Sequence, residues 1–202
     1  MSTDYLMPAS ILGKEIESNR NSFYMKCKKN QRHNITTDKQ VFFLKSGTIS
    51  IYRMKDDMLT MDVNSPAVLG LSFIKEFTPM HYFRCTSECE LHVLGLNHTM
   101  RMLNEKNLWE QAFYNVSELV QHYMKRDALV IQKNSHAIVM EHLRVIWSMD
   151  DDTREKTSIY TYILERNIIS RSAIHKVVTD LINQSVINIH RGKLTAFNDR
   201  RR

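Results

Sequence analysis

One stretch of the chain, residues 170–197, constrains the fold more than any other part of the sequence. Its first half carries four apolar residues at the spacing of one helical face. They are Ile174, Val177, Val178 and Leu181. Ser170 stands before them and is a favourable N-cap, because its hydroxyl can accept a hydrogen bond from an amide of the first turn. The pattern therefore predicts a helix that begins after Ser170 and buries one face.

The second half of this stretch changes to a strand pattern. Residues 186–189 and 194–197 read as strands, and the turn-forming sequence His-Arg-Gly-Lys at 190–193 lies between them. The helix face opposite the apolar one has only short, polar or basic side chains: Arg171, Ser172, His175, Lys176 and Thr179. A polar helix face followed by a hairpin with a basic tip predicts a winged helix-turn-helix. In that fold the helix enters the major groove of double-stranded DNA and the hairpin touches phosphate.

The expected DNA contacts follow from this arrangement. Side chains on the exposed helix face should meet base edges, and side chains at the helix start and hairpin tip should meet phosphates. The expected base contacts are Ser172, His175 and Lys176, with Thr179 on the same face. The expected phosphate contacts are Ser170, Arg171, Arg191 and Lys193.

The segment before this stretch fits the same interpretation. Three successive aspartates, residues 150–152, offer an N-cap and place negative charge at the start of a helix, where it interacts favourably with the helix dipole. A helical stripe runs to Arg166, and residues 167–169 read as the turn into Ser170.

Charge distinguishes a DNA-binding module from a module used only for protein contacts. Residues 154–202 carry ten Lys and Arg against four Asp and Glu, and this excess accounts for the whole net charge of +6. The preceding residues are neutral overall. Positive charge confined to one end suits phosphate neutralisation, although half of it comes from the terminal residues Arg200 to Arg202, which could equally be a solubilising tail.

Bulk properties limit the other classes of protein. The chain has 202 residues, 43% of them hydrophobic, which is enough for a packed core. It has no apolar run of 18 residues and no signal-peptide pattern at its start, so we expect no membrane span and a cytoplasmic location. Three cysteines give no disulfide framework.

The first half of the chain reads as many short strands separated by turns, which is typical of a β-roll or sandwich. The region of residues 107–130 then reads as one long helix with apolar residues at heptad spacing: Trp109, Phe113, Val116, Val120 and Tyr123. This seam could pack on the β-domain or pair with its copy, and a reader of palindromic DNA favours a homodimer through this helix. The predicted domains are a β-roll at 1–105, a central helix at 106–136 and a winged helix-turn-helix at 137–202.

The order of β-roll, long helix and winged helix-turn-helix resembles the CRP/FNR superfamily of bacterial transcription regulators, an α+β fold with a cyclic-nucleotide-binding-like domain. The resemblance rests on Ser170-Arg171, on Val186-Ile187 followed by Gly192, and on the glycine-containing unit at 41–53. Within the superfamily the chain is similar to the IprA-like group. The segments that carry this similarity are 107–113, 162–172 and 191–194.

Departures from the family pattern bear on the ligand. The family's cyclic-nucleotide binders hold the ribose with a Glu after a Gly and the phosphate with an Arg-Ser pair. Here Leu71 follows Gly70, and Pro79 and Met80 stand at the Arg-Ser positions. An uncompensated buried phosphate is costly, so we do not expect cyclic AMP to bind. The family's recognition-helix Glu and second Arg are replaced by Ser172 and Lys176, so the usual operator is not implied.

Other chemistry finds little support in the sequence. An iron–sulfur centre needs about four cysteines. Cys85 and Cys89, four residues apart on one strand, would lie roughly 13 Å apart, whereas a disulfide needs about 7 Å. Only a turn at residues 86–88 would bring them together, and buried structural thiols are the expectation. No metal-ligand, nucleotide-loop or nucleophile motif occurs, so we expect no cofactor, no metal and no enzyme.

The predicted function is therefore a DNA-binding transcription regulator, with RNA polymerase as a further partner to consider. Two alternatives stay open. One is a regulator gated by another small ligand in the β-roll, and the other is a β-roll adaptor for protein contacts with a basic tail. The resemblance also implies oxidative-stress or virulence-related physiology, by analogy only.

Overall fold

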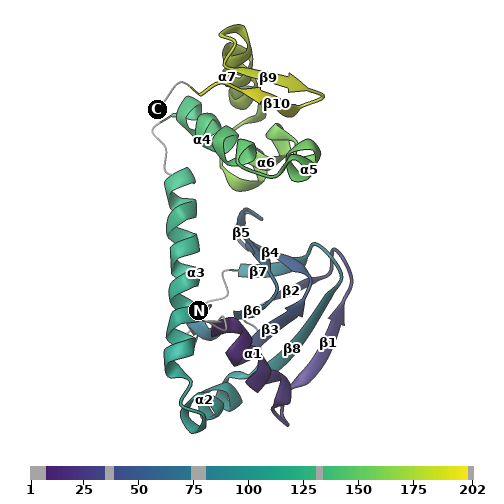
Figure 1. Cartoon of the computed structure of the whole chain (residues 1–202), viewed down its shortest axis with the longest axis vertical. Coiled ribbons are helices and arrows are strands. Elements are labelled where there is room, and N and C mark those ends of the chain that lie inside the picture. Colours follow the sequence, from purple (N-terminus) through teal and green to yellow (C-terminus); the bar gives the residue numbers. More distant parts are fainter. Residues whose placement is uncertain (1–7, 35–38, 74–80, 131–133, 200–202) are drawn as a thin grey trace, which may run out of the picture. The chain divides into compact units, whose positions relative to one another are not determined.

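The structure is a computed structural model that describes residues 8–34, 39–73, 81–130 and 134–199. The chain divides into two compact units, residues 1–123 and 124–202, and each is described by itself. Figure 1 shows the first unit as a curved set of β-strands with helices at one side, and the second as a small helical domain with a two-stranded hairpin. The α+β fold class predicted from the sequence is confirmed.

The first unit is built on two four-stranded antiparallel sheets. One has the order β1-β8-β3-β6 and the other β2-β7-β4-β5. The strands are β1 (Phe23–Cys27), β2 (Arg32–Asn34), β3 (Gln40–Ser46), β4 (Thr48–Arg53), β5 (Leu59–Asn64), β6 (Ala67–Leu69), β7 (His81–Cys85) and β8 (Cys89–Gly95). The other elements are α1 (Pro8–Ser18), the 3-10 turn η1 (Leu71–Phe73), α2 (Leu96–Glu105) and α3 (Trp109–Val130).

Alternation along β3 divides the core of this unit into two clusters, because successive side chains of a strand point to opposite faces. Phe42 and Leu44 pack between the two sheets, where Phe42 meets Phe83 edge to face at 5.5 Å between ring centroids. Val41 and Phe43 point the other way, into a cluster shared with α1, α2 and the first turns of α3. The space between the sheets is therefore filled by apolar side chains.

Two turns shape this unit. After β6 ends at Leu69, Gly70 takes a φ of +97° before η1. Residues 86–88 form the turn between β7 and β8, so Cys85 and Cys89 do not share a strand. The positions of Pro79 and Met80 lie outside the described residues.

Helix α3 packs on the β-roll through one side only. Leu108, Ala112 and Asn115 are buried on that side, and the Asn115 side-chain amide donates to the Val68 carbonyl oxygen at 3.0 Å. Val116 also packs against this cluster, so one member of the predicted seam belongs to the β-roll core. Other apolar residues of α3 are exposed: Trp109, Phe113, Val120 and Met124.

Beyond α3, the described residues of the second unit form four helices and a hairpin. They are α4 (Ser135–Trp147), α5 (Asp151–Lys156), α6 (Ile159–Arg166), α7 (Arg171–Asn183), β9 (Ile187–His190) and β10 (Lys193–Phe197). One apolar cluster joins α4, α6, α7 and both strands. Asn134 is the N-cap of α4, and its side chain accepts from the Ala137 amide at 2.9 Å.

The aspartate cap at 150 and the stripe that ends at Arg166 belong to two helices, α5 and α6. Thr157 takes an extended conformation between them, and Ser158 then caps α6. Arg154 holds the short α5 in place, since its guanidinium bonds to the Met149 carbonyl at 3.2 Å and lies 4.5 Å from the Trp147 ring centroid. No helix in the described part of the chain is long and apolar enough to cross a membrane.

Candidate nucleic-acid interface

The helix predicted to enter the major groove is α7, and it begins as the sequence indicated. The Ser170 hydroxyl accepts from the Ala173 amide at 3.1 Å, which satisfies one unpaired donor of the first turn. The Ser170 and Ser172 hydroxyls lie 3.0 Å apart. The four residues of the apolar face are all buried, at 8% exposure or less: Ile174, Val177, Val178 and Leu181. This packing fixes the rotation of α7 against the domain.

The opposite face of α7 is exposed at every predicted contact position. These positions are Arg171, Ser172, His175, Lys176 and Thr179. Two of them are held by Tyr160 of α6. The Tyr160 hydroxyl lies 3.1 Å from His175 Nδ1, and the Arg171 guanidinium lies 5.4 Å from the centre of the Tyr160 ring. Lys176 and Thr179 extend the same face farther along the helix.

The predicted wing is the β9–β10 hairpin. His190 pairs with Lys193, so Arg191 and Gly192 form a two-residue turn with φ values of +49° and +77°. Two successive positive φ values are typical of a type I′ turn, which suits the twist of a hairpin. The Ile159 amide donates to the Gly192 carbonyl oxygen at 3.0 Å, which ties the wing turn to the start of α6.

The start of α6 therefore contacts both parts of the predicted interface. Ile159 binds the wing turn through its backbone, and the next residue, Tyr160, binds the exposed face of α7 through its side chain. The start of α6 thus lies against both the exposed face of α7 and the tip of the hairpin. The sequence did not single out Tyr160, because its contact with His175 joins residues 15 positions apart and leaves no periodic signal.

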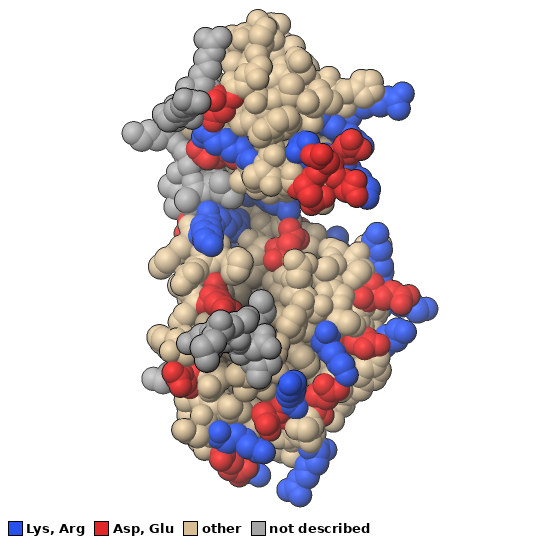
Figure 2. Space-filling model, viewed as in Figure 1, with Lys and Arg blue, Asp and Glu red and all other residues tan. Residues whose placement is uncertain are grey.

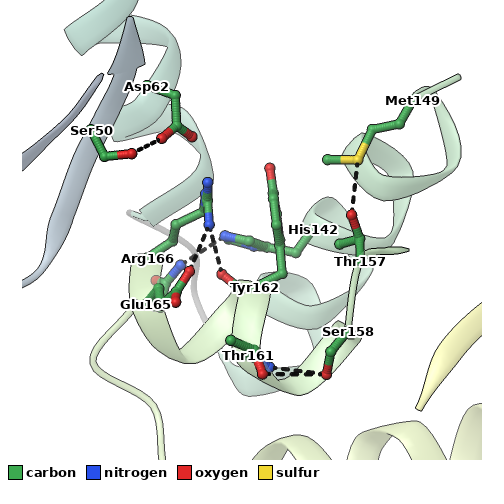
Figure 3. Close-up of polar contacts among 11 residues, drawn as sticks. Ser50, Asp62, His142, Met149, Thr157, Ser158, Thr161, Tyr162, Glu165 and Arg166 are labelled. Atoms are coloured by element: carbon green, nitrogen blue, oxygen red, sulfur yellow. Dashed lines mark hydrogen bonds and ion pairs between the residues drawn. The ribbon is translucent and has the colours of Figure 1, made fainter. Parts of the chain in front are cut away.

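A buried histidine of α4, His142, lies beside α6 (Figure 3) and contacts the residue that follows this helix. His142 of α4 is 1% exposed, and its Nδ1–H donates to the Ile138 carbonyl oxygen at 2.9 Å. Its Nε2 accepts from the side-chain amide of Asn167 at 3.0 Å. Burial lowers the pKa of His142, and the nearby Arg166 acts in the same direction, whereas the Ile138 hydrogen bond and Glu141 oppose the shift. The neutral imidazole is the form that these contacts fit.

The surface of this domain is not uniformly basic. Figure 2 shows Lys and Arg side chains at the hairpin tip and Asp and Glu side chains over α5. The acidic residues of α5 include Asp151 and Asp152 in its first turn, and Asp151 pairs with Arg154 at 2.5 Å. Helix α5 lies against β10, so these carboxylates border the hairpin.

The described residues contain no group of three or more His, Cys, Asp and Glu that could hold a metal ion. Cys27, Cys85 and Cys89 are free thiols, all buried in the cluster between the sheets. Cys27 of β1 lies opposite Cys89 of β8 in the strand register. Burial and the neighbouring thiols raise the pKa of Cys85, and burial raises that of Cys27. These are properties of structural thiols rather than of reactive ones.

Comparison with known proteins agrees with this geometry. A family model described as winged helix-turn-helix DNA binding matches residues 135–200, which are α4 to the end of the hairpin. A solved structure described as a putative transcriptional regulator of the CRP/FNR family, from Eubacterium rectale, covers 99% of this chain and 93% of its own at 13% identity, with a TM-score of 0.63. The chain therefore carries a winged helix-turn-helix DNA-binding domain at its C-terminal end, and it has the fold of a CRP/FNR-type regulator.

Curated proteins give a second comparison. The chain is 26% identical over 165 residues to the "Inhibitor of hydrogen peroxide resistance" of Escherichia coli K12, covering 80% of this chain and 78% of that one. The protein of the same name from Salmonella typhimurium LT2 is 25% identical over 158 residues, covering 78% and 76%. That protein is IprA, so the predicted IprA-like resemblance is confirmed.

A second solved structure extends the fold comparison. It is titled as the c-di-GMP responsive global regulator CLP of Xanthomonas campestris and covers 88% of this chain and 94% of its own, at 11% identity and a TM-score of 0.66. At this identity the match shows the fold of the regulator alone.

Proposed function

We propose that the regulator reads duplex DNA in a sequence-dependent way through α7. In this proposal Ser172, His175 and Lys176 contact base edges, and Thr179 lies beside them. Ser170, Arg171, Arg191 and Lys193 contact phosphates. The observation that carries the proposal is the exposed polar face of α7, whose opposite face is buried and whose neighbour α6 also holds the wing turn.

Two substitutions test the division between base and phosphate contacts. Lys176→Ala should weaken binding to a selected duplex by about 1–3 kcal/mol and leave binding to a scrambled duplex nearly unchanged, since a base contact contributes only at the right sequence. Lys193→Ala should weaken both alike and lower the slope of affinity against salt by about one. Fluorescence anisotropy with duplexes selected from a random library measures both quantities. Equal losses on the two duplexes from Lys176→Ala would contradict its assignment to a base edge.

We also propose that the regulator acts as a homodimer through α3. Trp109, Phe113, Val120 and Met124 recur at spacings of four, seven and four, which is a seam compatible with pairing of two helices. They lie roughly a third of a turn away from the side of α3 that packs on the β-roll. Apolar residues that follow one helix side and stay exposed favour a second copy as their partner.

The β-roll in this proposal does not bind cyclic AMP. Leu71, at the position where the resembling family has a ribose-binding Glu, is 4% exposed and belongs to the apolar cluster under α1. A cavity of about 270 Å³ supports the second candidate, a regulator gated by another small ligand. Asn64 of β5 and the α3 residues Asn115, Glu118 and His122 are among its lining.

Thermal-shift measurements against metabolites test the second candidate, because a ligand of the folded state raises the melting temperature as its concentration rises. A matched Glu118→Gln variant should abolish the shift if the ligand occupies this cavity, and a shift that persists unchanged would exclude the cavity as its site.

Other parts of the proposal rest on fold and relatives. We propose a regulatory rather than an enzymatic role, in the cytoplasm, with RNA polymerase as a further partner. The name of the Escherichia coli relative supports target genes that affect peroxide resistance. We keep the domain division at 1–105, 106–136 and 137–202 as part of this proposal.

A further inference from the structure

Tyr160 is the one residue of α6 whose side chain touches two predicted DNA contacts among the residues described. Its hydroxyl lies 3.1 Å from His175 Nδ1, and its ring lies 6.4 Å from the imidazole between centroids, with 33° between the planes. The Arg171 guanidinium sits 5.4 Å from the centre of the ring. Tyr160 is partly buried, whereas Arg171 and His175 are both exposed. The partly buried Tyr160 side chain therefore supports the exposed side chains of Arg171 and His175.

The hydrogen bond at Nδ1 decides what the other ring nitrogen of His175 can do. A neutral imidazole has one N–H donor and one acceptor nitrogen, and the bond made by one nitrogen sets the state of the other. The positive charge of Arg171 beside the phenol favours Tyr160 as the donor, because accepting a hydrogen bond would bring more positive charge to its oxygen. Nδ1 then accepts, and the proton resides on Nε2.

An Nε2–H group on the exposed face can only donate. In the major groove the acceptors are N7 and O6 of guanine, N7 of adenine and O4 of thymine, whereas the amino groups of cytosine and adenine are donors. A histidine held in this form selects acceptor edges and rejects donor edges. Without its anchor, the same ring could rotate and exchange its two nitrogens.

We infer that Tyr160 is a positioning residue that holds His175 as an Nε2–H donor and so determines which base edge the regulator accepts at one position of its site. The inference rests on the proposed role of α7 in reading bases. It adds a residue outside the recognition helix and a rule for the base that His175 meets.

The first test needs no DNA. Long-range ¹H–¹⁵N spectra of histidine-labelled full-length protein, recorded at about pH 8, above the ordinary titration range of imidazole, report the state of each ring nitrogen. His175→Ala identifies the resonances. We expect a protonated Nε2 and an Nδ1 shifted as a hydrogen-bond acceptor, and Tyr160→Phe should move Nδ1 toward the position of an unbonded nitrogen. A protonated Nδ1 in the wild type, or identical spectra for the two proteins, would overturn the inference.

The second test measures specificity. Tyr160→Phe keeps the ring and removes only the hydroxyl, so its affinity for a duplex selected by the wild type should fall by about fivefold, with no change on a scrambled duplex and with relaxed preference at one base pair of each half-site. His175→Ala should relax the same base pair, and the double variant should lose no more than His175→Ala alone. Additive losses, or unchanged base preference in Tyr160→Phe, would refute the role.

A matched control separates this effect from loss of a tyrosine hydroxyl in general. Tyr114→Phe on α3 also removes a phenol that bonds to a side chain, Glu110 at 3.1 Å, and should leave base preference unchanged. If Tyr160→Phe proved unstable, His175→Ala and the wild-type spectrum would still decide the inference. A wild-type protein that selects no sequence would overturn the proposed function, whereas the spectra would judge the Tyr160–His175 pair separately.

Discussion

At the level of single residues, the three thiols show how burial changes the sequence interpretation. The turn at residues 86–88 removes the distance objection to pairing of Cys85 and Cys89. Their environment introduces a different one: each cysteine is completely buried, and the pKa values of Cys27 and Cys85 are raised. Since the thiolate is the reacting form, proximity here does not imply redox activity.

The prediction for these cysteines concerns labelling rates. Iodoacetamide should label all three far more slowly in the native protein than in urea, because labelling requires local opening as well as deprotonation. Mass spectrometry of the labelled chain gives the rate at each site. Rapid native labelling, or a Cys85–Cys89 disulfide formed with dilute peroxide, would restore a redox role for the β7–β8 turn.

Two glycines with positive φ, Gly192 and Gly70, differ in what an added Cβ would meet. A Cβ at Gly192 would meet no atom within 4 Å, so Gly192→Ala should cost only backbone strain, about 1–2 kcal/mol. A Cβ at Gly70 would lie 2.5 Å from the Gln40 carbonyl oxygen, so Gly70→Ala adds a clash with β3 to the same strain. Hydrogen exchange within each unit measures the two losses. An equal or smaller loss from Gly70→Ala would show that β3 moves aside.

At the level of elements, we expect the burial of His142 in α4 to make the stability of the helix-turn-helix domain depend on pH. Because the pKa of His142 is lowered on folding, the unfolded chain takes up this proton more readily than the native domain. The contribution of His142 to the free energy of unfolding is therefore complete above about pH 6.5 and declines as the pH falls toward the folded-state pKa. Glu141 and Arg166 are the charged groups that modulate this shift.

Hydrogen exchange of residues 135–199 at several pH values tests this dependence. His142→Gln should lower stability near neutral pH but flatten the loss below pH 6.5. His136→Gln, at an exposed position on the same helix, should keep the wild-type profile. An unchanged acid slope in His142→Gln would mean that another group is responsible.

The same elements show what the sequence could and could not predict. Helix α7 and the hairpin carry their whole signal locally, in the apolar spacing after Ser170 and in the Arg191–Gly192 turn, and both form as predicted. The break at Thr157 carries no glycine or proline, and the contacts that hold Arg154 beside it, with Met149 and with Trp147 of α4, leave no local pattern in the sequence. Tyr160 was missed for the same reason, since its contact with His175 joins two helices.

At the level of the whole molecule, α3 has two sides with different surroundings. Leu108 and Ala112 are buried against the β-roll, so that side is already used within the chain. The exposed seam includes Phe113 and Met124, at 68% and 67% exposure. The heptad pattern alone could not tell these two sides apart. The predicted seam grouped Val116, which packs on the β-roll, with residues that are exposed.

The dimer proposal makes a prediction that separates assembly from folding. Phe113→Glu should convert the regulator to a monomer, because it places a charge at the centre of the exposed seam, while changing the stability of the unit by no more than about 0.5 kcal/mol, as is usual for an exposed site. Lys125→Glu introduces a larger change of charge roughly 120° around the same helix and should leave the dimer intact. Analytical ultracentrifugation gives the mass of each variant.

DNA binding gives an independent measure of assembly. A monomer bears only one α7, so Phe113→Glu should lose affinity for a duplex with two half-sites and keep the weaker affinity for a duplex with one. A wild-type monomer would refute the dimer, and dimers of equal strength in both variants would place the contact outside the exposed seam of α3.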